Sequence, residues 1–542
     1  MARLASITIL GLIFSPAVWA VTRHFNLTIG NKVIAPDGFD RSSIVVNGIF
    51  PGPASKGDDM AISVHNELTD PTMRRSTSIH WHGLFQARTS GMDGPSFVNQ
   101  CPIAPNSTFL YQYPLNEQTG SFWYHSHLST QYCDGLRGAL IIYDPNDPLK
   151  YLYDVDDEST IITLADWYHD QAPDAQKGFF ETGKVPIPDA GLINGVGRFV
   201  GGPEVPFAVI NVVRGKRYRL RLIQIACRPF FTFSVDNHNL TVIELDGVEH
   251  DPVEVQNADI YAAQRLSVIL HANQPVDNYW IRAPGTGGVG GPTGNPNLDV
   301  SLTKAILRYK GALAIDPVTN STPGLKMNDA DMHPIAQVGP GNLGDGPADF
   351  AITLSISQPN PPFFDINGIS YVSPSVPVLL QILSGAAQPT DFLPSEQVIV
   401  LPPNKIIEVS IPGTGAHPFH LHGHTFDIIR VSNSDVVNLV NPPRRDVVPS
   451  KRFRFPVSST TYLLNFRDLS QVNGGNTTFR FFSGNPGAWF LHCHIDWHLE
   501  AGLAVVFGED PAGSLTGNQS QIVQQDWSAL CPEYNGLAPE FQ

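Results

Sequence analysis

Four His-x-His pairs are the residues of this sequence best suited to chemistry. In a β-strand, side chains at positions i and i+2 point to the same face, so each pair would present two imidazoles in one direction. One such pair is weak evidence for a metal site, but four pairs are hard to reach by chance. Their eight imidazoles suit three metal ions, two with three nitrogens each and one with two. The pairs are His80 and His82, His125 and His127, His420 and His422, and His492 and His494.

The last of these pairs encloses a cysteine in the segment WFLHCHIDWH, residues 489–498. If the two flanking histidines face one way in a strand, the cysteine faces the opposite way, toward a second site. A thiolate with two imidazoles and a weak axial group is the ligand set of blue copper, whereas structural zinc needs four ligands at short spacings. A leucine at the axial position cannot ligate, which disfavours Cu(II) and raises the reduction potential. The predicted ligands of this copper are His417, Cys493 and His498, with Leu503 at the axial position.

The composition indicates that strands position these histidines. The 542 residues include 47 glycines and 46 prolines, and long stretches of helical periodicity are scarce, which favours short strands joined by turns. Period-2 alternation predicts a strand over 217–225 and a hairpin over 231–245 that turns at 236–239. Residues near 312–350 are typical of a linker. We therefore expect an all-β fold with three sandwich-like domains, at 21–150, 151–320 and 321–542.

The N-terminal segment predicts export. Residues 1–20 carry Arg3, an apolar core and small residues at Val18 and Ala20, which is the pattern of a cleaved secretory signal peptide. The net charge of −16 offers no basic face to a nucleic acid, and no later segment is apolar enough to cross a membrane. We expect a secreted, extracellular monomer with no nucleic-acid or membrane partner. Six N-x-S/T sequons are candidate glycosylation sites, at Asn26, Asn106, Asn239, Asn320, Asn476 and Asn518.

Five cysteines leave one over in an oxidising compartment. Cys493 is the odd one by context, because histidines surround it and a metal would protect its thiol. The other four, Cys101, Cys133, Cys227 and Cys531, allow three connectivities on sequence grounds alone.

Four long segments resemble the copper signatures of multicopper oxidases, specifically fungal laccases. They are HWHGLFQ…DGPSFVNQCPI, WYHSHLSTQYCDGLRG, HPFHLHGHTF and HCHIDWHLEAGLAVVF, and the resemblance runs from about residue 22 to the C-terminus. It implies three cupredoxin domains and four copper ions, with the trinuclear cluster between the first and third domains. It also implies disulfides between Cys101 and Cys531 and between Cys133 and Cys227. The implied ligands are His417, Cys493 and His498 for type 1 copper, His80 and His420 for type 2, His82, His125 and His494 for one type 3 copper, and His127, His422 and His492 for the other.

The resemblance implies one-electron oxidation of phenolic or aromatic donors, coupled to four-electron reduction of O₂ to water, in lignin or phenolic degradation or in detoxification. Electrons would enter near His498 and pass from Cys493 to the histidines on either side of it. O₂ reduction consumes protons, so a carboxylate is expected near the cluster. Asp93 matches the family's acid there, and Asp496, in the ligand strand, is a second candidate. Either could instead orient an imidazole. The family does not use His424, for which we expect a packed or surface position.

The sequence departs from the family at three places. Arg228 stands where many fungal laccases carry a carboxylate that contacts the phenol. It would either line the pocket and favour anionic donors, or turn outward into solvent. Gly91 stands where a tryptophan is common. Residues 449–472 fill a gap that the family spans with fewer residues, as either a surface loop or a retained non-coding stretch.

Three other functions compete with a laccase. A ferroxidase would need acidic residues near type 1 copper, but the residue four before His417 is Gly413, and Arg228 is basic. Ascorbate-oxidase-like activity is a minor alternative. A non-catalytic copper-binding homologue is disfavoured by the complete ligand set.

Overall fold

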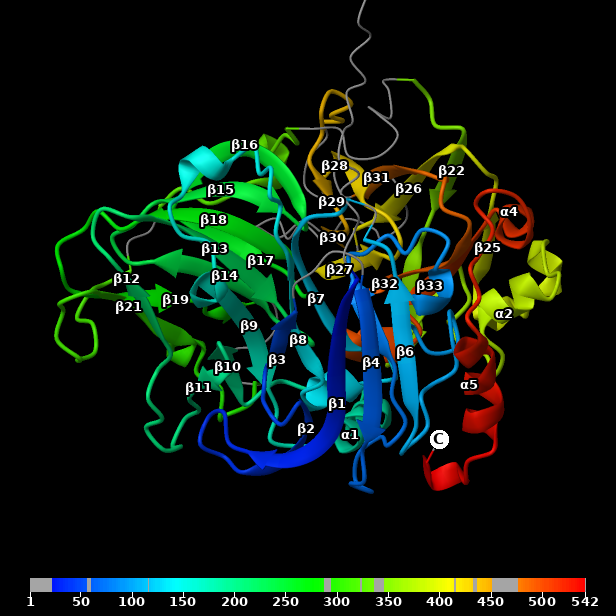
Figure 1. Ribbon diagram of the computed structural model, residues 1–542, viewed down its shortest axis with the longest axis horizontal. Coiled ribbons are helices and arrows are strands. Elements are labelled where there is room, and N and C mark those ends of the chain that lie inside the picture. The colour runs from blue at the N-terminus through cyan, green and yellow to red at the C-terminus, as the bar shows by residue number, and fades with distance from the viewer. Residues whose placement is uncertain are drawn as a thin grey trace, which may run out of the picture.

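The computed structural model describes residues 22–55, 60–115, 117–286, 294–321, 324–335, 346–413, 416–431, 436–450 and 476–541 (Figure 1). Its strands fall into three groups in chain order. Each described strand forms sheet hydrogen bonds only with strands of its own group. The blue first group lies beside the yellow-to-red third group, and the green middle group lies to one side. The predicted all-β fold is therefore confirmed. The signal segment 1–20 and residues 451–472 lie outside the described residues.

The first group contains two four-stranded sheets. One has the order β2-β1-β4-β6, with β1 (Arg23–Ile34), β2 (Arg41–Val46), β4 (Met60–Glu67) and β6 (Thr108–Tyr113). The other has the order β3-β8-β7-β5, with β3 (Gly52–Ser55), β5 (Ile79–His82), β7 (Gly120–Ser126) and β8 (Arg137–Ile142). The strands β5 and β7 end in the first two His-x-His pairs.

The middle group has a seven-stranded sheet and a six-stranded sheet. The first has the order β11-β10-β9-β13-β18-β15-β16, with β9 (Ile161–Trp167), β10 (Ala190–Ile193), β11 (Val196–Gly197), β13 (Arg217–Gln224), β15 (Leu240–Leu245), β16 (Val248–Val255) and β18 (Arg265–His271). The second has the order β12-β21-β19-β14-β17 with β20 beside β14: β12 (Val209–Val212), β14 (Phe230–Val235), β17 (Asn257–Ile260), β19 (Asn278–Arg282), β20 (Gly285–Thr286) and β21 (Lys304–Tyr309).

The third group has two five-stranded sheets and a two-stranded sheet. One sheet has the order β22-β26-β31-β28-β29, with β22 (Phe350–Thr353), β26 (Ile406–Pro412), β28 (Phe426–Arg430), β29 (Arg444–Arg445) and β31 (Asn476–Phe482). The other has the order β25-β33-β32-β27-β30, with β25 (Val398–Leu401), β27 (His417–Leu421), β30 (Val447–Ser450), β32 (Gly487–Cys493) and β33 (Ala504–Glu509). The small sheet pairs β23 (Ile356–Asn360) with β24 (Phe363–Ile366).

The predicted hairpin at 231–245 is wrong, although both of its strands form. The strands β14 and β15 lie in different sheets of the middle group. The apolar residues of both strands, including Phe231, Phe233, Leu240 and Val242, are buried in one hydrophobic core. Alternation identified the strands but not their partners, because packing across a sandwich core produces the same alternation as pairing in one half-buried sheet.

Hydrophobic cores and disulfides join the groups. One core combines first-group residues such as Trp81 with third-group residues such as Phe490. The described α-helices are short: α1 (Ala172–Thr182), α2 (Val378–Leu383), α3 (Asp496–Glu500), α4 (Pro511–Leu515) and α5 (Gln525–Asn535). None of the helices in the described ranges is long and apolar enough to cross a membrane. Both implied disulfides form. Cys101–Cys531 links the first group to α5, and Cys133–Cys227 links the first group to the middle group.

The predicted linker near 312–350 packs against the middle group where it is described. Lys326 forms an isolated β-bridge with Asn257, and Pro334 forms another with His250. Strand pairing thus places part of the segment after residue 320 on the middle group, and the third group's strands begin at Phe350.

Candidate metal centre

The eight paired histidines lie at strand ends where the first and third groups meet. His80 of β5 lies opposite His125 of β7, and His420 of β27 lies opposite His492 of β32. The second histidine of three pairs, at 127, 422 and 494, follows directly after its strand. Sheet pairing therefore brings together two His-x-His pairs within the first group and two within the third group, although the members of each couple are far apart in sequence. All eight side chains are buried.

The side chains of the predicted ligands gather into small sets. In each set, one side-chain nitrogen or sulfur of every member lies within 4.8 Å of the others. Three sets consist of histidines alone, and the first two share His82: His80, His82 and His420; His82, His125 and His494; His127, His422 and His492. A fourth set is His417, Cys493 and His498.

The orientation of the imidazoles fits bound cations. His492 Nδ1 lies 3.0 Å from the carbonyl oxygen of Cys493, and His422 Nδ1 lies 2.8 Å from Asp93 Oδ2, so each Nδ1 carries the proton as a donor. The Nε2 atoms of these two histidines nevertheless face each other at 3.0 Å. Two lone pairs in contact are stabilised by a metal ion between them. Within the described residues, the Nε2 atoms of five further histidines of the cluster are buried without a hydrogen-bond partner, at His80, His82, His125, His420 and His494.

Burial favours the neutral, ligating form of seven of the imidazoles. Loss of solvation is the largest cause that lowers the pKa values of these seven, and neighbouring histidines lower most of them further. The pKa of His492 falls to about 3. The pKa is well below its ordinary value at His82, His125, His127, His420, His422 and His494.

Asp93 contacts the cluster, as the sequence predicted. Its Oδ2 accepts from His422 Nδ1, and its backbone oxygen accepts from His80 Nδ1 at 2.7 Å. The carboxylate is fully buried, and this burial raises its pKa although His80 lowers it. These contacts fix the orientation of two imidazoles.

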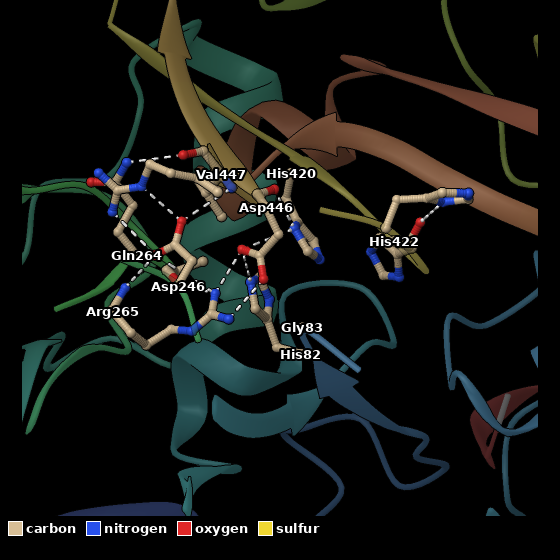
Figure 2. A network of polar contacts seen from close by, with 12 residues as sticks. His82, Gly83, Asp246, Gln264, Arg265, His420, His422, Asp446 and Val447 are labelled. Carbon is tan, nitrogen blue, oxygen red and sulfur yellow. Dashed lines mark hydrogen bonds and ion pairs between the residues drawn. The ribbon is translucent and has the colours of Figure 1, made fainter. Parts of the chain in front are cut away.

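Asp446 is a second carboxylate at the cluster, and sequence reasoning missed it. Its backbone oxygen accepts from His420 Nδ1 at 2.9 Å, and its Oδ1 lies 3.5 Å from His82 Nε2 (Figure 2). Burial raises its pKa to about 6, against the lowering effect of Arg265. No spacing rule links this aspartate to the histidine pairs, because it reaches them only through the pairing of His420 in β27 with Val447 in β30.

The cysteine site lies on the other side of β32. Cys493 Sγ lies 3.6 Å from His417 Nδ1 and 3.7 Å from His498 Nδ1, and the two nitrogens are 3.0 Å apart. Burial raises the thiol pKa of Cys493, so a thiolate there requires a cation. His498 is half-buried, whereas the other two side chains are buried. Leu503 is fully buried, and its carbonyl oxygen accepts from the backbone N–H of Cys493 at 3.1 Å.

Three other predicted positions have distinct environments. Asp496 begins helix α3 rather than lying in the strand, and its Oδ2 lies 3.5 Å from Cys133 Sγ. Burial, reinforced by nearby carboxylates, raises its pKa well above the ordinary value. His424 is packed, with its Nε2 3.1 Å from Glu509 Oε2. The outward-turned alternative for Arg228 is wrong: it is half-buried and its Nη1 donates to the carbonyl oxygens of Val185 (2.9 Å) and Pro186 (2.5 Å).

Two further sequence features can be placed. A Cβ at Gly91 would lie 3.0 Å from Trp527 Nε1, so an indole from α5 packs against the position where the family commonly has a tryptophan. Asn476 is half-buried at the start of β31, whereas the other five sequon asparagines are exposed: Asn26, Asn106, Asn239, Asn320 and Asn518.

Comparisons with known proteins agree with this arrangement. Models of the multicopper oxidase family match residues 28–147, 158–312 and 371–513. Laccase-1 of Agaricus bisporus is 65% identical over 543 residues, which cover 100% of both chains. The crystal structure of the laccase from Botrytis aclada superposes with a TM-score of 0.80 at 32% identity and covers 96% of this chain and 93% of that one. The crystal structure of Fet3p, a multicopper oxidase that functions in iron import, superposes with a TM-score of 0.80 at 28% identity, and the match covers 95% of this chain and 95% of that one. The expectation of three cupredoxin-like domains is confirmed.

Proposed function

Since the chain belongs to the multicopper oxidase family and is a fungal laccase, we propose that its histidine and cysteine sets hold four copper ions. His417, Cys493 and His498 would hold the type 1 ion, and His80 and His420 the type 2 ion. The type 3 pair would be held by His82, His125 and His494 and by His127, His422 and His492. Bound copper supplies one-electron redox chemistry and a site at which O₂ is reduced.

The observation that carries this function is the position of Cys493 between the two sites. Its side chain faces His417 and His498, while its sequence neighbours His492 and His494 belong to the histidine cluster. The covalent chain therefore connects the half-buried edge at His498 with the enclosed cluster. Phenolic or aromatic donors would give up one electron at a time beside His498. Four such electrons and four protons convert O₂ to two waters.

Two carboxylates have separate roles in this proposal. Asp93 would orient His422 and His80 through its hydrogen bonds, and it is the candidate proton source at the cluster because burial raises the pKa of its carboxyl group. Asp496 is a weaker proton candidate, since it contacts the Cys133–Cys227 bridge, with its Oδ2 3.5 Å from Cys133 Sγ and its backbone N–H donating to the carbonyl oxygen of Cys227. Tyr132 lies between the disulfide and the histidine cluster, because it precedes Cys133 in the chain and its hydroxyl lies 3.4 Å from His494 Nδ1.

Arg228 would favour anionic aromatic donors. It is half-buried, and its charge contributes to the lowered pKa of His498, after burial and His417. A fixed cation beside the donor edge attracts a carboxylate on the donor and disfavours a cationic one. Arg228→Gln should lower kcat/KM about threefold to tenfold for a hydroxycinnamate, with little change for its methyl ester. Lys216→Gln, at an exposed position, controls for net charge. Equal effects on both donors would contradict this role.

The remaining expectations form part of the proposal. The chain would be secreted as a monomer after loss of residues 1–20, with domains at 21–150, 151–320 and 321–542 and glycans on the exposed sequons. Asn476 is the sequon whose half-buried position least favours modification. Mass measurement before and after enzymatic deglycosylation would identify the modified asparagines.

Oxygen uptake by the copper-loaded protein tests the function. We expect uptake with a phenol to exceed uptake with Fe²⁺ or ascorbate, together with the intense absorption of a copper–thiolate bond. A preference for Fe²⁺ would favour the ferroxidase alternative. Absence of the copper–thiolate band would contradict the type 1 site.

A further inference from the structure

A buried ion pair connects the middle strand group to the histidine cluster. Arg265 opens β18 of the middle group, and Asp446 lies between β29 and β30 of the third group. Figure 2 shows Asp446 between Arg265 on one side and His82 and His420 on the other. The middle group supplies none of the eight paired histidines, so this pair is a route by which it can act on them.

The geometry of the pair is bidentate and leaves the guanidinium little freedom. Arg265 Nη1 and Nη2 donate to Asp446 Oδ1 and Oδ2 at 2.6 and 2.7 Å. Arg265 Nε donates to the carbonyl oxygen of Ser121 at 2.9 Å, so the same side chain also holds β7 of the first group. Both partners are completely buried. Such a fork fixes the carboxylate in position and in plane.

Asp446 transmits this position to two histidines from different groups. Its backbone oxygen accepts from His420 Nδ1 at 2.9 Å, which leaves His420 Nε2 directed toward the cluster, and its Oδ1 lies 3.5 Å from His82 Nε2. Gly83 makes the approach possible. A Cβ there would lie 2.4 Å from Arg265 Nη2 and 2.9 Å from Asp446 Oδ2, and its φ of +94° also favours glycine.

The residues on either side of Asp446 are held by the same middle strands. Arg445 Nε donates to Asp246 Oδ2 at 2.9 Å, and Gln264 Nε2 donates to the carbonyl oxygen of Val447 at 3.0 Å. The backbone N–H of Arg265 donates to Asp246 Oδ1 at 2.7 Å. Three consecutive residues, 445–447, are therefore fixed against the middle group.

We propose that Arg265 is a positioning residue for the His80–His420 pair, acting through Asp446 to hold His420 in the orientation that binds type 2 copper. The inference rests on the proposed function, because that function assigns copper to the pair. Without the guanidinium, the Asp446 carboxylate would be buried without its main counter-charge and would rotate or draw in water, and His420 would lose its fixed acceptor.

Arg265→Lys is the first test, with Arg219→Lys as its matched control. Arg219 is also buried in the middle group and pairs with Asp147 and Glu244 at 2.7 and 2.6 Å, away from the histidines. Both variants lose a bidentate group inside the same sheet. We expect Arg265→Lys to weaken copper binding at the type 2 site about 10- to 100-fold, with a smaller type 2 EPR signal and an unchanged copper–thiolate band. The control should retain full copper content even if its melting temperature falls.

A double variant keeps the test decisive if the single variant folds poorly. Arg265→Met with Asp446→Asn removes both charges, and replacing a buried ion pair with neutral groups is usually tolerated. We expect this protein to fold and still show a weakened type 2 signal. Type 2 copper equal to wild type in the double variant, or equal losses in Arg265→Lys and Arg219→Lys, would overturn the inference. Absence of type 2 copper from the wild-type protein would instead contradict the proposed function.

Discussion

The two candidate copper regions differ in enclosure and in the number of elements that build them. The cysteine site is built by β27, β32 and α3 of one strand group, and one of its ligands is half-buried. The histidine cluster is built by strand ends of two groups, is fully buried, and has Asp93 and Asp446 behind its imidazoles. The first region is suited to contact with donors of varied shape. The second is suited to a small substrate that needs several electrons and protons.

This difference shows which imidazoles are held in a fixed orientation by hydrogen bonds. No carboxylate hydrogen-bonds His417 or His498 among the described contacts, whereas His422 is held by a carboxylate and His420 by a backbone oxygen whose residue is itself held by Arg265. Perturbing the cysteine site should therefore change electron entry, and perturbing the cluster should change O₂ reduction.

The largest expected effect comes from Cys493→Ser. An alcohol at this position does not supply the thiolate, so the copper–thiolate band should vanish and donor oxidation should fall to the background rate. The histidine cluster should still bind its copper, because Cys493 faces away from it. Visible spectra and copper counts check this, with Leu491→Met on the same strand as a control. Loss of all copper would show that the two regions are not separable.

Asp93→Asn should give the next largest effect, about a 10- to 100-fold loss of activity. The amide keeps the size of the side chain but cannot match the carboxylate as acceptor or proton source. The copper–thiolate band should persist, because the change lies at the cluster. Asp37→Asn is the matched control, since Asp37 is equally buried and lies 2.8 Å from His169 Nε2, outside both regions. Equal losses in the two variants would argue against a specific role for Asp93.

Acid should weaken the copper-free protein in a defined range. Burial lowers the pKa values of His417 and His492 in the folded chain, to about 4 and about 3. The unfolded chain therefore takes up protons that the folded chain refuses as pH falls below about 6.5. The free energy of unfolding should fall between pH 6.5 and pH 3, and these groups should add no further loss below that. Urea titrations at pH 7 and pH 4.5 measure it. Equal stability at both values would contradict the neutral, buried imidazoles.

Copper release should sharpen the comparison between the regions. In this assignment two imidazoles hold the type 2 ion, whereas two imidazoles and a thiolate hold the type 1 ion, so loss of type 1 copper should depend more steeply on pH. Following the type 2 EPR signal and the copper–thiolate band through one acid titration would separate the two. A steeper loss of the type 2 EPR signal would contradict the assignment.

Leu503→Met should have the smallest effect. Methionine adds a weak axial ligand, which lowers the reduction potential of the cysteine site, and the similar volume limits the loss of stability to less than about 1.5 kcal/mol. Redox titration of the copper–thiolate band checks this, with Leu220→Met in the middle core as the control. An unchanged potential would mean that Leu503 does not occupy the axial position.

Strand periodicity identified the His-x-His pairs, and the structure brings these pairs together, whereas the assignment of each ligand to one ion rests on the family resemblance and stays a prediction. Sequence reasoning failed where only pairing decides the outcome. The segment 231–245 has the alternation of a hairpin, yet its strands enter different sheets. Asp446 and Arg265 carry no local signal, since they meet through contacts across 181 residues of sequence. Arg228 could be assigned an environment only once Val185 and Pro186 were seen to accept its hydrogen bonds.

Anomalous diffraction at the copper absorption edge, from crystals of the copper-loaded protein, tests the central claim most directly. The account predicts one peak within the triangle of His417 Nδ1, Cys493 Sγ and His498 Nδ1. It predicts three more among the Nε2 and Nδ1 atoms of the eight paired histidines. No peak in the cysteine triangle, or fewer than three in the cluster at full copper loading, would contradict it.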